Sequence, residues 1–255
     1  MVAEIEFQGS GGLIEGKLAT AKIEVNTNKG LKFDGSNDWI ACGTDSNYDI
    51  SNNLVVMCWA KNDNSQTGNS GGDREHLVSK YAGTNNERCY RLYHKDDKIH
   101  FGTGYDSDGS TPGGLAVEVT ADLGTLGYNL QDWHHYAGVF DDGHMYMFID
   151  GRCVAYTDNS GVGSGRAATI HVRNSRQVNI GSYEDGSGVF DGYIADVFIY
   201  NSHMLDDASV RSTAARSLAI ENAAGKIGGS PTNLHQIAAG WQLNDGTGST
   251  ATEWV

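Results

Sequence analysis

The sequence has little positive charge. It contains 18 Lys and Arg residues against 32 Asp and Glu residues, which gives a net charge of −14. Nucleic-acid-binding surfaces and surfaces that attach to anionic membranes both need clustered Lys and Arg, so the composition argues against both kinds of partner. The acidic excess is compatible with Ca²⁺ binding, because hard cations prefer carboxylate and carbonyl oxygens, and equally with a simple role in solubility.

Long apolar runs and a leader peptide are also missing. No apolar stretch is long enough to cross a bilayer, so we expect no membrane insertion. The first residues, MVAEIEFQGSGG, contain no basic region followed by an apolar run. We therefore expect no signal peptide and synthesis in a cytoplasm.

Proline and cysteine are scarce, with 2 and 4 residues. None of the cysteines has the CxxC spacing of a zinc site. Most of them fall in expected strands, where a free Cys behaves as a small buried hydrophobe, although the even count leaves disulfides open. The four are Cys42, Cys58, Cys89 and Cys153.

Glycine is abundant, and so are segments whose side chains alternate in character from one residue to the next. The clearest pattern spans Trp133–Gly151, where two alternating apolar and aromatic runs are separated by Asp141, Asp142, Gly143 and His144. This pattern predicts a β-hairpin. Because both faces of the two runs are largely apolar, we expect the hairpin to lie in the middle of a sheet.

Short strands are expected along most of the remaining chain. Their ranges are Leu31–Gly43 (with a turn inside it), Leu54–Ala60, His76–Tyr81, Arg88–Tyr93, Lys98–Gly102, Leu115–Val119, Val178–Gly181, Phe190–Tyr200 and Ile237–Leu243. The convincing helix signal lies at 206–222, where Asp206 can cap apolar residues at helical spacing. These elements predict an all-β, two-sheet antiparallel jelly-roll sandwich with one short helix near the C-terminus.

Six segments then resemble a known family. They read LKFDGSNDWIACG, LVVMCWAK, HLVSKY, DWHHYAGVFDDGHMYMFIDGR, NIGS and FDGYIADVFIYN, in that order. The order is similar to laminin-G-like and pentraxin-like jelly rolls of the concanavalin-A-like lectin and glucanase superfamily, over about residues 30 to 202. We therefore expect a 1–28 arm or outlying strands, a 29–202 jelly roll, and a 203–255 helix and terminal strand packed on the same domain.

The end of the chain, GWQLNDGTGSTATEW, adds to this resemblance. In cellular relatives a similar segment often precedes the FDG motif, whereas in laminin-G-like proteins encoded by bacteriophages a comparable stretch follows the last sheet strand. The resemblance therefore implies a virion surface protein, such as a capsid decoration or fibre. Its expected partners are other virion subunits, a cell-surface glycan, or further copies of itself.

The resemblance also implies a structural Ca²⁺ at the sandwich edge. Its ligands would be Asp34, Asn37 and Asp38 in the FDGSND turn, with Asp196 from the last long strand. Such a set of oxygens suits Ca²⁺. The alternative is that Asp34 and Asn37 bond their own turn backbone, while Asp196 faces solvent or a buried amide.

The sequence shows no clear set of catalytic residues. Glucanases of this superfamily carry closely spaced carboxylates on one strand, and retaining chemistry needs two carboxyl groups about 5 Å apart. The acids on expected strands, Asp150, Asp191 and Asp196, are single in their motifs. His134 and His135 are adjacent on a strand and so face opposite ways, which predicts structural roles. We expect no enzyme, with a glycan-active hydrolase or lyase as the alternative.

A glycan site would need an exposed aromatic ring beside amide or carboxylate groups, usually on rim loops. Five residues meet these conditions: Tyr81, Tyr105, Asp106, Asp108 and Tyr183. Trp59 and Trp133 lie within expected strands, so we expect them in the core. We expect Trp241 and Trp254 to pack the terminal segment onto the sandwich. The sequence thus predicts a non-catalytic, lectin-like module, with a purely structural interaction module as a further alternative.

Overall fold

The computed structural model describes residues 30–63, 74–82, 88–105, 115–141, 143–157, 170, 172, 175–183, 186–201, 237–241 and 243. Several expectations lie outside these residues: the 1–28 arm, the helix at 206–222, Asp106, Asp108 and Trp254. The division of the chain at residues 28 and 202 therefore stays a prediction.

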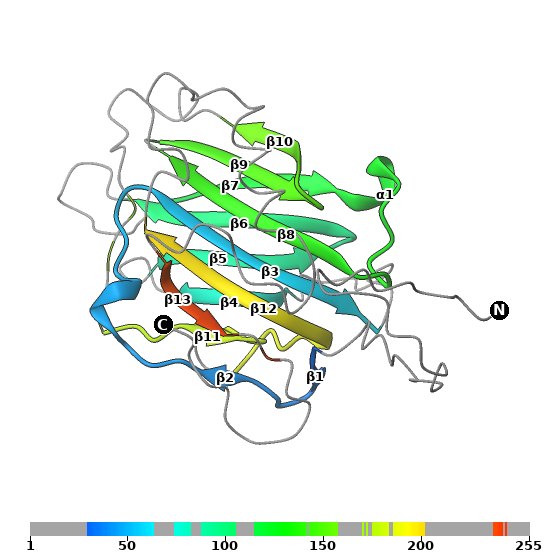
Figure 1. The fold of residues 1–255 in the computed structure, drawn as a ribbon, viewed down its shortest axis with the longest axis horizontal. Helices are drawn as coiled ribbons and strands as arrows, with labels where there is room; N and C mark the ends of the chain where they lie inside the picture. Colours follow the sequence, from blue (N-terminus) through cyan, green and yellow to red (C-terminus); the bar gives the residue numbers. More distant parts are fainter. Residues whose placement is uncertain are drawn as a thin grey trace, which may run out of the picture.

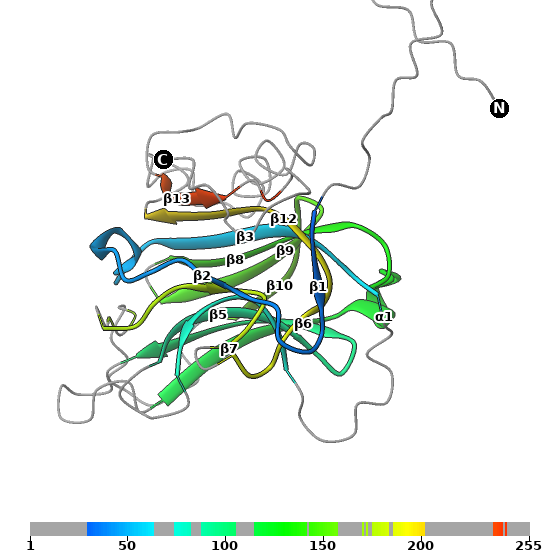
Figure 2. The ribbon, with the colours of Figure 1, turned by 90° about the horizontal axis from the view of Figure 1, so that it is seen from below.

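The described chain forms two stacked antiparallel sheets, as Figure 2 shows edge-on. The seven-stranded sheet has the order β1-β12-β3-β8-β9-β10, with β13 also paired to β12. Its strands are β1 (Leu31–Asp34), β3 (Leu54–Asn62), β8 (His134–Asp141), β9 (His144–Ile149), β10 (Arg152–Thr157), β12 (Asp191–Asn201) and β13 (Ile237–Trp241). The predicted all-β sandwich is confirmed.

The six-stranded sheet has the order β2-β11-β4-β5-β6-β7 and lies behind the other sheet in Figure 1. Its strands are β2 (Ile40–Ala41), β4 (Glu75–Tyr81), β5 (Arg88–Lys95), β6 (Lys98–Tyr105), β7 (Leu115–Asp122) and β11 (Asn179–Ile180). Three hairpin-like steps join β4 to β7, so residues far apart in sequence come into register on one face.

The predicted central hairpin is β8–β9. Strand β8 pairs with β3 on one side and β9 on the other, so it has no free edge. Both faces are buried: Tyr136 and Phe140 belong to the core between the sheets, while Ala137 and Val139 belong to a second apolar cluster on the other face. The prediction of a central, two-sided hairpin is confirmed.

Gly138 shows how closely the two sheets approach. A Cβ atom at this position of β8 would lie 2.2 Å from the ring of Phe101 on β6, which is fully buried. We predict that Gly138→Ala lowers the free energy of unfolding by about 1–3 kcal/mol, because an overpacked core must shift side chains or backbone. Urea denaturation measures this change.

Gly124→Ala is the matched control for that experiment. Gly124 lies in the short helix α1 (Leu123–Leu126), and a Cβ there would come no closer than 3.7 Å to another atom. Alanine favours helix, so the control is expected to be neutral or slightly stabilising. Equal losses for both variants would contradict the close approach of the sheets at Gly138.

Helix α1 was not predicted. The Asp122 side chain accepts a hydrogen bond from Thr125 N at 2.8 Å, and Gly127 ends the helix in the left-handed conformation. This cap is local and visible in the sequence, but four residues are too few for a periodic apolar signal.

The tryptophans correct one prediction. Trp59 and Trp133 were expected in the core, but both are only partly buried. Trp59 instead packs edge-on against His135 on the outer face of the seven-stranded sheet, with ring centroids 5.6 Å apart. Trp241 is 3% exposed, and its ring centroid lies 5.9 Å from that of Tyr48. These contacts confirm that β13 packs on the sandwich.

The two adjacent histidines face opposite ways, as predicted. His134 Nδ1 lies 2.8 Å from Asp150 Oδ2 and its ring packs on Tyr128, whereas the His135 ring is on the Trp59 side. Asp150 Oδ1 also accepts the His135 backbone N–H at 2.9 Å. Asp150, in the turn between β9 and β10, thus contacts both histidines at the start of β8.

None of the four cysteines, all of which lie among the described residues, forms a disulfide, which answers the question that the sequence left open.

Candidate functional site

A row of side chains crosses the outer face of the six-stranded sheet. In register, His76 on β4 is opposite Tyr93 on β5, Tyr93 is opposite His100 on β6, and His100 is opposite Thr120 on β7. Residues directly opposite each other in antiparallel strands project to the same face. The rings stack: His76 and Tyr93 are 5.3 Å apart, and Tyr93 and His100 are 4.7 Å apart and nearly parallel.

The next row contains an ion pair that passes over a glycine. Arg91 on β5 is opposite Gly102 on β6, and Gly102 is opposite Glu118 on β7. Arg91 Nη2 donates to Glu118 Oε1 across the middle strand. A Cβ at Gly102 would lie 3.0 Å from Glu118 Cγ and 3.1 Å from its Oε1, so the missing side chain leaves the room that the pair uses.

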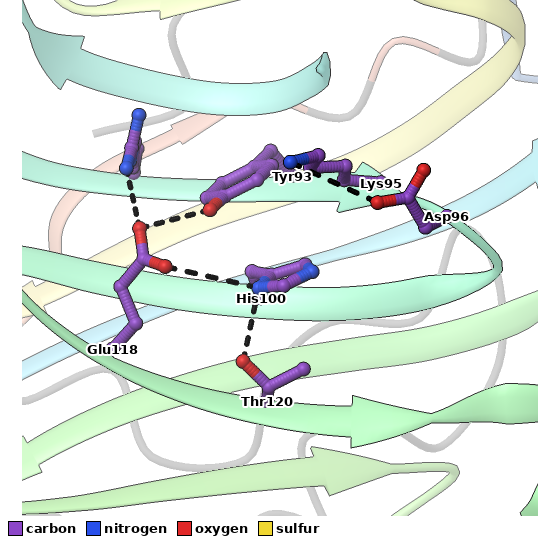
Figure 3. Close-up of polar contacts among 7 residues, drawn as sticks. Tyr93, Lys95, Asp96, His100, Glu118 and Thr120 are labelled. Carbon is purple, nitrogen blue, oxygen red and sulfur yellow. Dashed lines mark hydrogen bonds and ion pairs between the residues drawn. The ribbon is translucent and has the colours of Figure 1, made fainter. Parts of the chain in front are cut away.

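The two rows are joined at Glu118, as Figure 3 shows. Tyr93 OH donates to Glu118 Oε1 at 2.8 Å, and Glu118 Oε2 lies 3.9 Å from His100 Nδ1. Thr120 Oγ1 is 2.9 Å from the same His100 nitrogen. A carboxylate that accepts from Arg91 and Tyr93 is held in one orientation, because charge-assisted hydrogen bonds are the stronger kind.

Two tyrosines extend this network toward the neighbouring strands. The Arg91 guanidinium lies 4.3 Å from the ring centroid of Tyr81 and 4.5 Å from that of Tyr93. Tyr183, in the segment after β11, packs on Tyr81 at 6.0 Å and on His76 at 4.9 Å. The Arg74 guanidinium lies 5.7 Å from the ring centroid of Tyr93. We call the whole group the tyrosine–arginine cluster, and it consists of Arg74, His76, Tyr81, Arg91, Tyr93, His100, Glu118 and Tyr183.

Local hydrogen bonds position Tyr183. Its backbone N–H donates to Ser187 O at 2.8 Å and its carbonyl accepts from Gly186 N at 3.0 Å, which closes a tight turn. The same carbonyl accepts from Asn179 Nδ2 and from Ser182 Oγ. These bonds hold Tyr183 beside β4, where its ring contacts His76 and Tyr81.

Buried members of the cluster lie on the middle strand β5, and more exposed members flank them on both sides, Glu118 on β7 and Arg74 and Tyr183 beside β4. Arg91 is 7% exposed and Tyr93 is 1% exposed, whereas the Glu118 side chain is 29% exposed. Arg74 and Tyr183 are half-buried and Thr120 is exposed. A ligand would therefore reach Glu118, Tyr183 and Arg74 before the buried members.

Burial and charge set the protonation states. Burial raises the pKa of Glu118, but the Arg91 charge and the hydrogen bonds from Tyr93 and Arg91 outweigh burial, so the pKa lies below its usual range. Burial raises the pKa of Tyr93 to about 12 and lowers that of His100. At neutral pH the cluster thus holds a carboxylate, guanidinium groups, neutral phenols and a neutral His100.

The structure brings together two of the five predicted ligand residues. Tyr81 and Tyr183 meet in the cluster, but Tyr81 is 3% exposed, so it supports the site from beneath and is not the exposed platform that was expected. Tyr105 ends β6, and nothing is described of its side chain; Asp106 and Asp108 lie outside the described residues.

Sequence reasoning missed Arg91, Tyr93, His100 and Glu118. A signal was present, because Arg91 and Tyr93 alternate with the core residues Tyr90 and Leu92. That alternation places two polar side chains on an outer face, yet it does not say which residues of other strands lie beside them.

The predicted calcium ligands do not assemble as one site. Asp34 Oδ1 accepts from Ser36 N at 2.8 Å and Asn37 N at 3.3 Å, and Asp38 Oδ2 accepts from Asp34 N at 3.1 Å. Asp34 is opposite Asp191, and Asp196 lies five residues farther along β12 and is 3% exposed. At about 3.3 Å per residue the separation is roughly 16 Å, too far for one metal.

The turn therefore matches its alternative explanation, in which Asp34 caps its own backbone. The pKa of Asp34 is lowered, first by the Ser36 and Asn37 backbone donors. No group of three or more His, Cys, Asp and Glu side chains that could hold a metal occurs within the described part of the chain. Calcium binding stays a prediction, now without Asp196.

No helix among the described residues is both long and apolar enough to span a membrane.

Comparison with solved structures finds the same fold in other proteins. The CBM40 of the Ruminococcus gnavus IT-sialidase, bound to α2,3-sialyllactose, is 13% identical with a TM-score of 0.51, over 75% of this chain and 96% of that one. The enzymatically active domain of tailspike protein 2 from bacteriophage CBA120 is 12% identical with a TM-score of 0.51, over 87% of this chain and 34% of that one.

Domains LG4-5 of the mouse laminin α1 chain are 14% identical with a TM-score of 0.46, over 68% of this chain and 41% of that one. The chain thus spans less than half the length of the laminin and tailspike chains that it matches. No curated protein sequence matches it. A laminin-G-like family model matches residues 34–211, most of the chain, which therefore belongs to the concanavalin A-like lectin/glucanases superfamily.

Proposed function

We propose that this protein is a non-catalytic carbohydrate-binding module and that the more exposed members of the tyrosine–arginine cluster form its glycan site. The observation that carries the proposal is the Arg91–Glu118 pair, fixed beside stacked aromatic rings and next to half-buried Tyr183. Sugars offer hydroxyl groups to charged donors and acceptors, and C–H faces to aromatic rings. Sites of this kind combine a few oriented polar groups with aromatic walls.

The family adds general support. The superfamily includes lectins, and the R. gnavus CBM40 of similar fold is bound to α2,3-sialyllactose. At 13% identity this likeness concerns the fold alone, and a fold hosts many functions. The cluster, not the fold, is therefore the reason for locating the site on the six-stranded sheet.

Tyr183→Ala tests the proposal. We predict that it weakens binding to the glycans recognised by the wild type at least tenfold, which corresponds to about 1.4 kcal/mol, because it removes the most accessible ring of the cluster. A glycan array identifies the ligands, and isothermal titration calorimetry measures the affinities.

Tyr156→Ala is the control, since Tyr156 is 51% exposed but lies on β10 of the other sheet. It should bind as the wild type does. Unchanged affinity in Tyr183→Ala, or a stronger loss in Tyr156→Ala, would refute the location of the site.

Absence of catalysis is part of the proposal. Glycosidases of the usual kind use two carboxyl groups, and the described cluster is built around one carboxylate, Glu118. The alternative, a hydrolase or lyase, would release product from the glycans that bind on the array. A purely structural module would leave the array blank while still assembling on capsids.

We further propose a place on a virion surface, with other virion subunits as partners. Support comes from the resemblance of the chain's end to phage-encoded laminin-G-like proteins, and the tailspike neighbour shares the fold at 12% identity. Cryo-electron microscopy of purified particles, with labelled antibody against this chain, tests the location. Particles without the chain would exclude it.

Calcium is retained as a proposal for the 34–38 turn alone. If the turn binds Ca²⁺, the melting temperature of EDTA-treated protein rises when millimolar CaCl₂ is added, because a ligand that binds only the folded state stabilises it. If Asp34 and Asp38 serve only as turn caps, the melting temperature does not change.

A further inference from the structure

The tyrosine–arginine cluster gathers positive charge in an acidic protein. The chain carries a net charge of −14, yet Arg74, Arg88 and Arg91 all lie within electrostatic range of Tyr183. Burial raises the pKa of Tyr183, and each of these three arginines opposes that rise. Arg74 also lies 5.7 Å from the ring centroid of Tyr93. Within the described cluster, Glu118 is the carboxylate that lies close to these arginines.

Arg74 and Arg91 each have an N–H donor that is not used in a hydrogen bond among the described residues. A guanidinium has five N–H donors, and Arg91 spends Nη2 on Glu118. Arg91 Nε and Arg74 Nε are buried and have no hydrogen-bond partner within the described part of the chain. Both Nε atoms are enclosed by the protein, so a ligand would have to bond to the other N–H donors of the two guanidinium groups.

The excess positive charge and the arginine N–H donors both favour a ligand that carries negative charge. A neutral hydroxyl would satisfy a donor but would leave the excess positive charge uncompensated. An anionic group would do both, and Arg binds carboxylate and similar anions through its planar fork. Glu118 already accepts from Arg91, through the single donor Nη2.

We propose that the cluster selects acidic sugars, whose anionic group lies beside Arg74 and Arg91 while the sugar ring contacts Tyr183. This inference rests on the proposed glycan-binding function and specifies its ligand class. Glu118 holds Arg91 in place, and its repulsion of an anion restricts the anionic group to the Arg74 side of the cluster.

Two matched pairs of saccharides test the selection. The first is 3′-sialyllactose against lactose, and the second is trigalacturonic acid against its fully methyl-esterified form. Calorimetry is expected to show at least tenfold tighter binding of the acidic member in each pair that binds. The advantage should shrink severalfold between 50 mM and 500 mM NaCl, because salt screens partly exposed charges.

Arg74→Gln locates the effect. Arg74 is half-buried and is expected to tolerate substitution, and the variant should lose most of the preference for the acidic member while retaining binding to its neutral partner. Arg152→Gln, at an exposed position of β10, should keep the full preference. Circular dichroism confirms that both variants are folded.

The outcomes separate the two proposals. Equal affinity for acidic and neutral members overturns the inference and leaves glycan binding intact, as does a preference that survives in Arg74→Gln. Failure of every saccharide on the array and in both pairs to bind overturns the glycan function itself.

Discussion

Lys80→Met is expected to lower the free energy of unfolding by about 3–5 kcal/mol, because it leaves the Asp49 carboxylate, whose side chain is 11% exposed, without its partner. Lys80 is fully buried, and its Nζ lies 3.0 Å from Asp49 Oδ1. It also donates to the carbonyl of Arg176. One side chain thus joins β4 to the segment after the 3-10 helix η1 (Ser46–Tyr48) and to the segment before β11.

Chemical denaturation of a double-mutant cycle measures the coupling. Lys80→Met and Asp49→Asn are made singly and together, and the double variant is expected to recover part of the loss, since the unpaired charge is gone. Lys95→Met is the surface control, because Lys95 is 3.7 Å from Asp96 and the Asp96 side chain is 55% exposed. A surface pair contributes about 0–1 kcal/mol. A cost below 1 kcal/mol for Lys80→Met would show that the buried pair is not a structural tie.

The second large effect is a loss of stability in acid, and it arises from two buried histidines, His94 and His135. Burial lowers the pKa of His94 to about 3 and that of His135 to about 4. In the unfolded chain both imidazoles titrate near 6.5. The unfolded state therefore binds protons that the folded state does not, so the stability present above pH 6.5 is lost as pH falls below it. At pH 5 the loss is about 2 kcal/mol for each group.

His94→Leu is expected to remove half of this dependence. His94 packs between Tyr136 at 5.0 Å and Phe190 at 6.1 Å, and neither ring nitrogen has a hydrogen-bond partner among the described residues. An apolar side chain of similar size loses no hydrogen bond there. Thermal unfolding at pH 8 and pH 5 should show a smaller fall in melting temperature than for the wild type.

The matched control variant is His144→Gln, at an exposed position of β9. The melting temperature of His94→Leu could instead fall as steeply as that of the wild type between pH 8 and pH 5. That result would mean that His94 of the folded wild-type protein takes up a proton as readily as it does in the unfolded chain. The position of that ring between two aromatic side chains would then be wrong.

Much of the fold was predictable from local pattern. The alternation in Trp133–Gly151 predicted a two-sided hairpin, and β8–β9 has that form. The expected strand at Ile237–Leu243 is β13, which pairs with β12 beyond the end of β1. The Trp59 prediction failed because an aromatic residue in a strand can face either side of the sheet, and the Trp133 prediction failed because this residue lies just before β8 begins.

The candidate site was predictable only in part. Tyr81 and Tyr183 were named for their residue type and loop positions, and the structure does bring them together. Both were expected to be exposed, but Tyr81 is covered and only Tyr183 is partly accessible. Burial depends on neighbours from other strands, and sequence position alone does not reveal them.

The order of polar and apolar residues by itself determined where strands form and which side chains share a face, since the period of two belongs to the backbone of a single strand. Only the tertiary structure decided that Arg91 and Glu118, 27 residues apart, meet across Gly102. Contacts between strands depend on register, and a slip of one residue would turn each of these side chains to the other face of its strand.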